Sequence, residues 1–146
     1  QLRAAPPAGD FRLEAGDAPV LLIGAGVGVT PLVSMLAAAV AEGRAVSFIE
    51  AARNRDEATL AAEIAALAAD SRARLTRLFS QPGTDARASG HDEHTGRLNA
   101  ALLATLIPSR ECAVYLCGPT AFVTDVSAWL VEAGVAPENI HSESFG

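Results

Sequence analysis

Residues 20–40 read VLLIGAGVGVTPLVSMLAAAV, and this stretch decides the fold. Its apolar run at 20–23 predicts a buried strand, and its run at 32–40 predicts a helix. Three glycines spaced by two lie between them, followed by Thr30 as the expected N-cap and Pro31 as the expected first helical residue. Glycine backbones approach anions closely, and the first N–H groups of a helix attract them. We interpret the stretch as a phosphate-binding turn, with a plain tight turn as the alternative.

The turn departs from the ordinary dinucleotide fingerprint. The pattern Gly-x-Gly-x-x-Gly fits in neither register, counted from Gly24 or from Gly26. A related dinucleotide site stays open, in which Gly26, Gly28 and Thr30 carry the diphosphate. In such a site Gly28→Val would set a side chain against the diphosphate, so we expect it to lower nucleotide affinity without unfolding the domain.

Strands and helices alternate along the rest of the chain. This pattern predicts an α/β fold, a doubly wound parallel sheet of five or six strands with helices on both faces. Gln81–Gly96 is expected to be a long polar loop. We expect strands at 20–24, 45–51, 73–80, 113–117 and 140–145, and helices at 31–42, 56–69, 98–106 and 120–133.

Three features follow predicted strands, at the edge where such sheets bind ligands. They are the glycine turn, Arg53–Arg55 after the second strand, and Cys117–Pro119 after the fourth. Arg53 and Asn54 would lie beside the adenosine ribose of a dinucleotide, where an arginine could accept the phosphate of NADPH. Solvated loop charges are the alternative interpretation, so the choice between NADH and NADPH stays open.

Size and charge restrict the functional class. The chain has 146 residues, enough for one domain with a core, and half of them are apolar. A net charge of −6 without a basic stripe argues against nucleic acid as the main partner. We expect no membrane partner, because no apolar stretch is long enough to span a bilayer and no signal peptide opens the chain. Because the chain begins with Gln1, we expect it to be a piece of a longer protein.

Cysteines and histidines indicate the compartment and exclude a strong metal signal. Cys112 and Cys117 are expected on opposite faces of a strand, where they are poorly placed to bridge, which favours the reducing cytoplasm. His91 and His94 have no nearby thiolate, so they are a weak zinc signal and are expected in a polar surface loop. We therefore expect no metal site.

Two motifs carry a resemblance to a known family. Gly26–Pro31 resembles the Gly-x-Gly-x-Thr-Pro diphosphate motif of the ferredoxin–NADP reductase superfamily, and Cys117–Pro119 resembles its Cys-Gly-Pro nicotinamide motif. Within that superfamily the chain is most similar to the flavohemoproteins, the bacterial nitric oxide dioxygenases. Further segments similar to theirs are Pro7–Phe11, Ala51–Asn54, Gln81–Pro82, Tyr115–Pro119 and Ile140–Gly146.

The resemblance implies a division of labour between domains. Residues 1–18 would end an upstream FAD domain or linker, and residues 19–146 would form the NAD(P)H-binding domain. The chain has no Arg-x-Tyr-Ser flavin motif, so FAD would be bound mainly by an upstream barrel, preceded in flavohemoproteins by a globin domain with haem. The implied activity is an NAD(P)H-dependent flavin oxidoreductase of the nitric oxide dioxygenase type, and this piece alone is expected to be inactive.

The resemblance also implies roles for single residues. Cys117 would pack beside the nicotinamide without acting as a nucleophile, Glu143 would help tune the flavin, and Phe145 would lie on the flavin until nicotinamide displaces it; these three form the implied catalytic site. A small core residue is the alternative for Cys117 and a frayed terminus for Phe145. The implied cofactor-binding residues are Gly26, Val27, Gly28, Thr30, Pro31, Arg53, Asn54, Cys117, Gly118, Pro119 and Phe145.

Two other functions remain possible from the sequence. The same module could belong to another FAD-dependent reductase that serves an iron–sulfur protein or an oxygenase. It could also be a non-catalytic module that binds a nucleotide for regulation.

Overall fold

The computed structural model of the chain describes residues 11–58, 60–69, 72–81 and 92–146. These residues form a six-stranded sheet in the order β4-β3-β2-β1-β5-β6, and every pair of neighbouring strands is parallel. The strands are β1 (Val20–Ala25), β2 (Val46–Ala52), β3 (Ala73–Phe79), β4 (Asp92–Thr95), β5 (Ala113–Pro119) and β6 (Ile140–Phe145). The predicted doubly wound α/β fold is confirmed.

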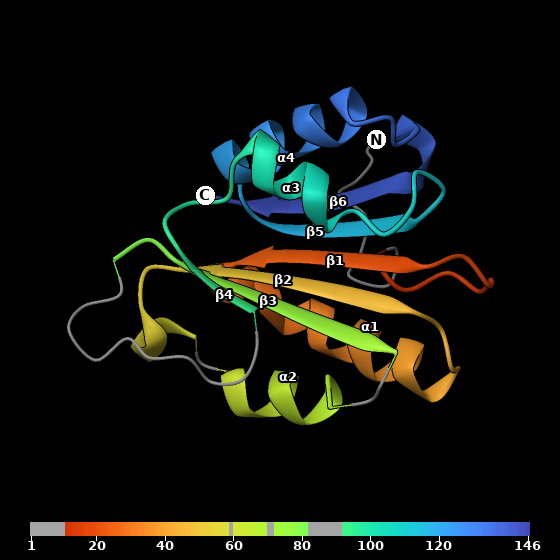
Figure 1. Ribbon diagram of the computed structural model, residues 1–146, viewed down its shortest axis with the longest axis horizontal. Helices are drawn as coiled ribbons and strands as arrows, with labels where there is room; N and C mark the ends of the chain where they lie inside the picture. The colour runs from red at the N-terminus through yellow and green to blue at the C-terminus, as the bar shows by residue number, and fades with distance from the viewer. Residues whose placement is uncertain (1–10, 59, 70–71, 82–91) are drawn as a thin grey trace, which may run out of the picture.

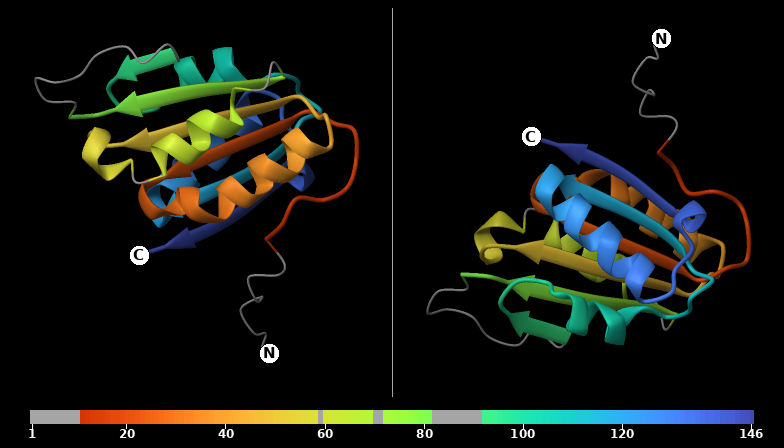
Figure 2. Two further views of the ribbon diagram at one scale, coloured as in Figure 1. Left: turned by 90° about the horizontal axis from the view of Figure 1, so that it is seen from below. Right: turned by 90° about the horizontal axis from the view of Figure 1, so that it is seen from above.

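Helices cover both faces of the sheet. α1 (Val29–Ala41) and α2 (Ala61–Leu67) lie on one face, and α3 (Ala100–Leu106) and α4 (Thr120–Glu132) lie on the other (Figures 1 and 2). Each face buries its own core. The first core includes Val20, Leu22, Leu32, Leu36, Phe48, Ile64, Leu75 and Tyr115. The second includes Leu21, Ile23, Ile49, Leu78, Leu103, Leu116, Val126 and Leu130.

The central strand explains why one apolar run decides the fold. All four residues of 20–23 are 0% exposed, and they alternate between the two cores. A parallel strand covered on both faces requires such a continuous apolar run. Among the described residues, no helix combines the length and the apolar character that a membrane crossing requires.

The chain order changes direction at β1. From β1 to β4 each new strand is added on one side, and β5 then returns to the other side of β1. Connections leaving such a pair diverge, and ligands of open α/β sheets bind in the crevice that results. Gly24 of β1 is the register partner of Cys117 in β5, so the two motifs found in the sequence meet at this point.

The start of α1 differs from the prediction. Gly26–Gly28 form a short 3₁₀ turn (η2) that runs directly into the helix, and the Val29 N–H donates to the carbonyl of Gly26. Gly28 is the N-cap, so the prediction that Thr30 caps the helix is wrong. Pro31 is the third helical residue and not the first, and it is tolerated there because N–H groups of the first turn lack intrahelical acceptors.

The segment predicted as one helix over 56–69 is divided. A short 3₁₀ turn, η3 (Arg55–Glu57), comes first and is capped by Asn54, whose side chain accepts from the Glu57 N–H at 3.2 Å. The helix itself covers only Ala61–Leu67. The turn keeps Glu57 beside the end of β2, where it matters for the site.

The predicted loop at Gln81–Gly96 contains a strand. Asp92–Thr95 form β4, which pairs in parallel with β3 at the edge of the sheet. Residues 82–91, with Pro82 and His91, lie outside the described residues. A short edge strand of polar residues has no apolar alternation to reveal it.

The segment before β1 packs on the domain. The Phe11 ring meets Tyr115 edge-on, with ring centroids 6.2 Å apart. The Tyr115 hydroxyl accepts from the Glu14 N–H at 2.9 Å, and Arg44 donates to the Glu14 carbonyl at 2.9 Å. From Phe11 onward this segment, which the resemblance implies is the end of an upstream domain or linker, packs against the first core, whereas residues 1–10, with most of the Pro7–Phe11 motif, lie outside the described residues.

Candidate dinucleotide site

The glycine turn and the Cys-Gly-Pro segment touch each other. Gly28 is buried, and a Cβ added there would lie 2.6 Å from the carbonyl carbon of Cys117 and 3.0 Å from the Gly118 nitrogen. Glycine at position 28 therefore permits η2 to lie directly against the end of β5. The two motifs, 89 residues apart in the chain, form one continuous backbone surface.

This contact changes the role expected of Gly28. The missing side chain would point at the backbone of β5 and not at the open side of the turn. The premise that a Gly28→Val side chain would lie against the diphosphate is wrong, because the added atoms would first collide with Cys117 and Gly118.

Gly26 faces the opposite way. Its φ is +59°, a conformation that favours glycine, and a Cβ there would meet no atom within 4 Å. Val27 beside it is 68% exposed, and Thr30 is also exposed. The first turn of α1 holds no acidic residue and no side-chain cap. This end of the helix therefore offers uncompensated N–H groups and a positive dipole end to an anion.

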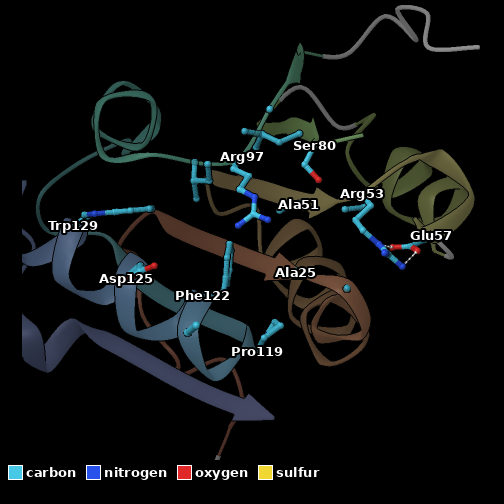
Figure 3. Close-up of a pocket in the computed structure, with 16 residues that line it drawn as sticks. Ala25, Ala51, Arg53, Glu57, Ser80, Arg97, Pro119, Phe122, Asp125 and Trp129 are labelled. Carbon is cyan, nitrogen blue, oxygen red and sulfur yellow. Dashed lines mark hydrogen bonds and ion pairs between the residues drawn. The ribbon is translucent and has the colours of Figure 1, made fainter. Parts of the chain in front are cut away.

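A cavity of about 440 Å³ begins at Gly26. Its floor is the carboxyl ends of β1, β2 and β3, and α4 and the segment after β4 form its walls (Figure 3). Three of the predicted binding residues line it: Gly26, Arg53 and Pro119. Val27 and Thr30 lie at the turn beside it, and Gly28, Cys117 and Gly118 support it from the backbone contact described above.

A charge pair stands at the β2 side of the cavity. Arg53 donates from Nε to Glu57 Oε1 at 3.1 Å and from an Nη to Oε2 at 2.6 Å. The hydrogen bond from Arg53 lowers the pKa of the Glu57 carboxyl, so the pair is ionised at neutral pH. The predicted ligand Asn54 instead uses its side-chain oxygen to cap η3. Sequence reasoning missed Glu57, although its position four residues after Arg53 is a spacing at which such pairs form.

Neighbouring contacts fix the backbone that carries Arg53. The Gln81 N–H donates to the Arg53 carbonyl at 2.7 Å. Arg55 pairs with Glu93 of β4 and lies over the Phe79 ring, 5.1 Å from its centroid. The loop after β2 is thus held by β3 and β4, and it is not a string of independently solvated charges.

A buried ion pair lies deeper under the same half of the site. Glu50 of β2 and Arg77 of β3 are register partners, with Nε to Oε1 at 3.0 Å and side chains 2% and 6% exposed. Arg77 also donates to the Ala61 carbonyl at the start of α2, at 2.7 Å. Burial raises the pKa of the Glu50 carboxyl, and the Arg77 charge opposes that shift.

Arg97 reaches the cavity because β4 places it there. Strand β4 ends at Thr95, and residues 96–98 then line the cavity wall. Figure 3 shows the Arg97 side chain extending into the cavity near Phe122, with Arg53 and Glu57 on the other side in this view. Because β4 was not predicted, neither was the role of Arg97.

Helix α4 supplies the aromatic wall. Phe122, Asp125 and Trp129 recur at helical spacing and line the cavity. A Cβ on Gly118 would lie 2.9 Å from the Phe122 ring, so the ring covers the end of β5. From the sequence, Phe122 and Trp129 look like core residues; here both are only partly buried, and Val126 and Leu130 occupy the core.

The implied flavin-side residues lie at the end of β6. In the sheet register Glu143 is the partner of Cys117, and Phe145 is the partner of Pro119. Phe145 is 37% exposed. Burial and the Glu143 charge raise the pKa of the Cys117 thiol, which argues against a thiolate nucleophile. Both cysteines are free and buried, in different cores.

No group of three or more His, Cys, Asp or Glu among the described residues could hold a metal ion. The exposed start of α1 adjoins the cavity at Gly26, an arrangement that can accommodate an anion. Residues 22–128 match the family described as oxidoreductase NAD-binding domain. The chain belongs to this family.

Individual members of the family narrow the likeness. The chain is 36% identical over 143 residues to a flavohemoprotein of Bacillus subtilis (strain 168), covering 96% of this chain and 36% of that protein. It resembles the flavohem-like FAD/NAD-binding domain of nitric oxide dioxygenase from Vibrio cholerae O1 biovar El Tor, with a TM-score of 0.82 and 34% identity, over 96% of this chain and 56% of that one. It also resembles the Malassezia yamatoensis flavohemoglobin with bound FAD and haem, with a TM-score of 0.74 and 32% identity, over 89% and 32% of the two chains.

These likenesses confirm the predicted flavohemoprotein-like NAD-binding reductase domain. The chain spans only 36% of the length of the Bacillus subtilis relative. The chain therefore corresponds to one part of such a protein, and the activity of the whole protein does not follow from this likeness alone.

Proposed function

We propose that this chain binds NADH or NADPH and positions it for hydride transfer to FAD in a flavohemoprotein-like nitric oxide dioxygenase. FAD would be held by an upstream barrel of the same protein, and electrons would continue to haem in a globin domain. The observation that carries the proposal is the contact between Gly28 and Cys117–Gly118, because it joins a diphosphate turn to a nicotinamide motif.

The diphosphate would rest on η2 and the first turn of α1. Gly26 lies open to solvent with space around it, and the N–H groups of Val27 and Thr30 belong to the same exposed turn. The favourable effect of a helix end on an anion is about 0.3–1 kcal/mol, and up to ~2 kcal/mol when partly buried. The cavity must therefore supply further contacts, and Arg53, Arg97 and the α4 aromatics are placed to do so.

When bound, NAD(P)H supplies the hydride and FAD accepts it. Hydride transfer needs no proton donor from this chain, so its residues would contribute by positioning the nicotinamide. Cys117 and Gly118, which lie against Gly28, would border the nicotinamide ring, and Pro119 beside them lines the cavity. The raised pKa of Cys117 keeps the thiol neutral, which suits a packing role next to a charged ring.

Phe145 and Glu143 would face the flavin. Both belong to β6, directly beside the nicotinamide wall, and Phe145 is exposed at the strand end. We place the end of the upstream domain or linker at residues 1–18 and the NAD(P)H-binding domain at 19–146. We also place the protein in the cytoplasm, because two buried free thiols suit a reducing compartment.

The single tryptophan of the chain makes the proposal directly testable. Trp129 lines the cavity, so NADH bound there is expected to quench its fluorescence and to emit by energy transfer. Titration of the chain with NADH should give a saturable signal and a matching binding isotherm by calorimetry. Absence of both signals at millimolar NADH and at millimolar NADPH would contradict the proposal.

A matched pair of variants tests the diphosphate position. Gly26→Asp and Gly26→Asn have similar shapes, and both residue types tolerate positive φ better than other side chains do. Gly26→Asp sets a negative charge at the turn, so its NADH affinity should fall by about tenfold or more relative to Gly26→Asn, consistent with ~1.4 kcal/mol or more of repulsion. Equal affinities in the two variants would show that the diphosphate lies elsewhere.

A further inference from the structure

In the proposed function, the charge pair of Arg53 and Glu57 lies beside the adenosine ribose, the part of the dinucleotide that carries a 2′-phosphate in NADPH and a hydroxyl in NADH. Arg53 is the second residue beyond Ala51, and Ala51 is the register partner of Ala25, which directly precedes Gly26. The cation is therefore on the strand next to the diphosphate turn, and both members of the pair line the cavity. In α/β dinucleotide sites this strand end meets the adenosine ribose.

We infer that Glu57 is a specificity-determining residue, which neutralises Arg53, accepts hydrogen bonds from the ribose diol and makes the site prefer NADH to NADPH. The inference rests on the proposed function. It makes the Glu57 carboxylate the group that decides between NADH and NADPH, a choice that Arg53 alone leaves open.

The geometry of the pair supports this assignment. Both oxygens of Glu57 are engaged by the guanidinium, one at 3.1 Å and the other at 2.6 Å, so Arg53 offers its best donors to its own neighbour (Figure 3). A 2′-phosphate would have to compete for these donors or use the remaining N–H groups of Arg53, and in both cases it would approach the Glu57 charge. A ribose diol carries no charge, and a carboxylate can accept from it while keeping the ion pair.

The neighbouring cations do not replace Arg53. Arg55 is the next arginine in the same loop, but it is bound to Glu93 and lies over Phe79. Arg97 comes from the other wall of the cavity, close to Phe122 (Figure 3). Within the described part of the chain it makes no ion pair and no side-chain hydrogen bond. Arg97 is therefore the second cation that the experiment has to examine.

The test compares NADH and NADPH dissociation constants by Trp129 fluorescence. The wild-type chain is expected to bind NADH about tenfold more tightly than NADPH. Glu57→Gln keeps the side-chain shape and removes the charge, so NADPH affinity should rise about fivefold or more while NADH affinity changes less than about twofold. Glu57 is exposed, and thermal unfolding should show that the variant folds normally.

Two further variants identify the cation. In Glu57→Gln combined with Arg53→Gln, the gain for NADPH should disappear. In Arg97→Gln, the two nucleotides should weaken by the same factor, because this arginine lies across the cavity from the pair. A selective loss of NADPH binding in Arg97→Gln would place the 2′-phosphate on Arg97 and overturn the inference.

The remaining outcomes distinguish a failure of the role given to Glu57 from a failure of the proposed function. A wild-type preference for NADPH, or an unchanged ratio in Glu57→Gln, would overturn the role of Glu57 while leaving nucleotide binding intact. If neither nucleotide bound to the wild-type chain, the proposed function would fail first, and the inference would fall with it.

Discussion

One half of the site is formed by backbone and the other half by charged side chains. At the β1–β5 side, η2 and the end of β5 meet backbone to backbone, without room for a Cβ on Gly28. At the β2–β3 side, charged side chains form the site: Arg53 with Glu57 at the rim, and Glu50 with Arg77 buried beneath. In the function proposed above, the backbone half would bind the diphosphate that all dinucleotides share. The side-chain half would distinguish between dinucleotides, because its charge depends on exposed side chains that single substitutions can neutralise.

The largest effect is expected in the buried part of the side-chain half. Arg77→Met leaves the Glu50 carboxylate without its partner, and removal of one member of a buried pair typically costs about 3–5 kcal/mol of unfolding free energy. Denaturant unfolding of the chain measures this loss. Replacing both residues with Met should recover most of it, because two apolar side chains leave no buried charge. A double variant as unstable as Arg77→Met would contradict this account.

The same variant should show a defined pH dependence. Burial raises the pKa of Glu50 above its ordinary value of 4.5, so the folded state binds the proton more tightly than the unfolded state. Stability contributed by Glu50 is therefore present at low pH and is lost as pH rises through the folded pKa. Without Arg77 the folded pKa rises further, so the loss in Arg77→Met should be smallest near pH 4.5 and grow towards neutral pH. A loss independent of pH would rule out Glu50 as its source.

The next largest loss of stability is expected from a substitution in the backbone half. Gly28→Val pushes atoms into the Cys117 carbonyl, and overpacking of this kind costs about 1–3 kcal/mol. Gly26→Asn is the matched control in the same turn: it adds a side chain in open space at a positive φ that Asn tolerates, so its cost should stay below about 1 kcal/mol. Thermal unfolding compares the two. Equal stability would mean that η2 can move away from β5.

The smallest effect concerns the thiol between the two motifs. Burial, with the Glu143 charge as a lesser cause, raises the pKa of Cys117, so a thiol reagent should label it slowly at pH 8. Alanine at Cys112, the other cysteine of the chain, isolates this signal. Glu143→Gln should then raise the labelling rate by about threefold at most, because burial persists. Rapid labelling of the wild-type thiol would contradict a packing role for Cys117.

The same contrast explains what could be predicted from sequence. The backbone half is encoded locally: an apolar run, spaced glycines and a helix predict strand, turn and helix in order, and only the helix start was misplaced, because a 3₁₀ turn precedes it. The contact of Gly28 with Cys117 was not predicted, because it depends on β5 returning to the far side of β1.

The side-chain half was harder to predict for a physical reason. Arg97 enters the cavity only because β4 pairs with β3, and β4 has a polar sequence without strand alternation. Trp129 looks like a core residue in the sequence, but in the structure it is only partly buried and lines the cavity. Arg53, a predicted cofactor-binding residue, does line the cavity, but its ionic partner Glu57 depends on η3, where an ordinary helix was expected.

The segment that precedes β1 is held to the domain at Glu14. Its N–H donates to the Tyr115 hydroxyl, two positions from Cys117 in β5, and its carbonyl accepts from Arg44. A polypeptide attached ahead of Phe11 would therefore not pivot at Pro19, because the chain is already bound to the domain at Glu14. A displacement of the chain at Glu14 would strain its hydrogen bond to Tyr115, and so would act first on β5, the strand that also carries Cys117.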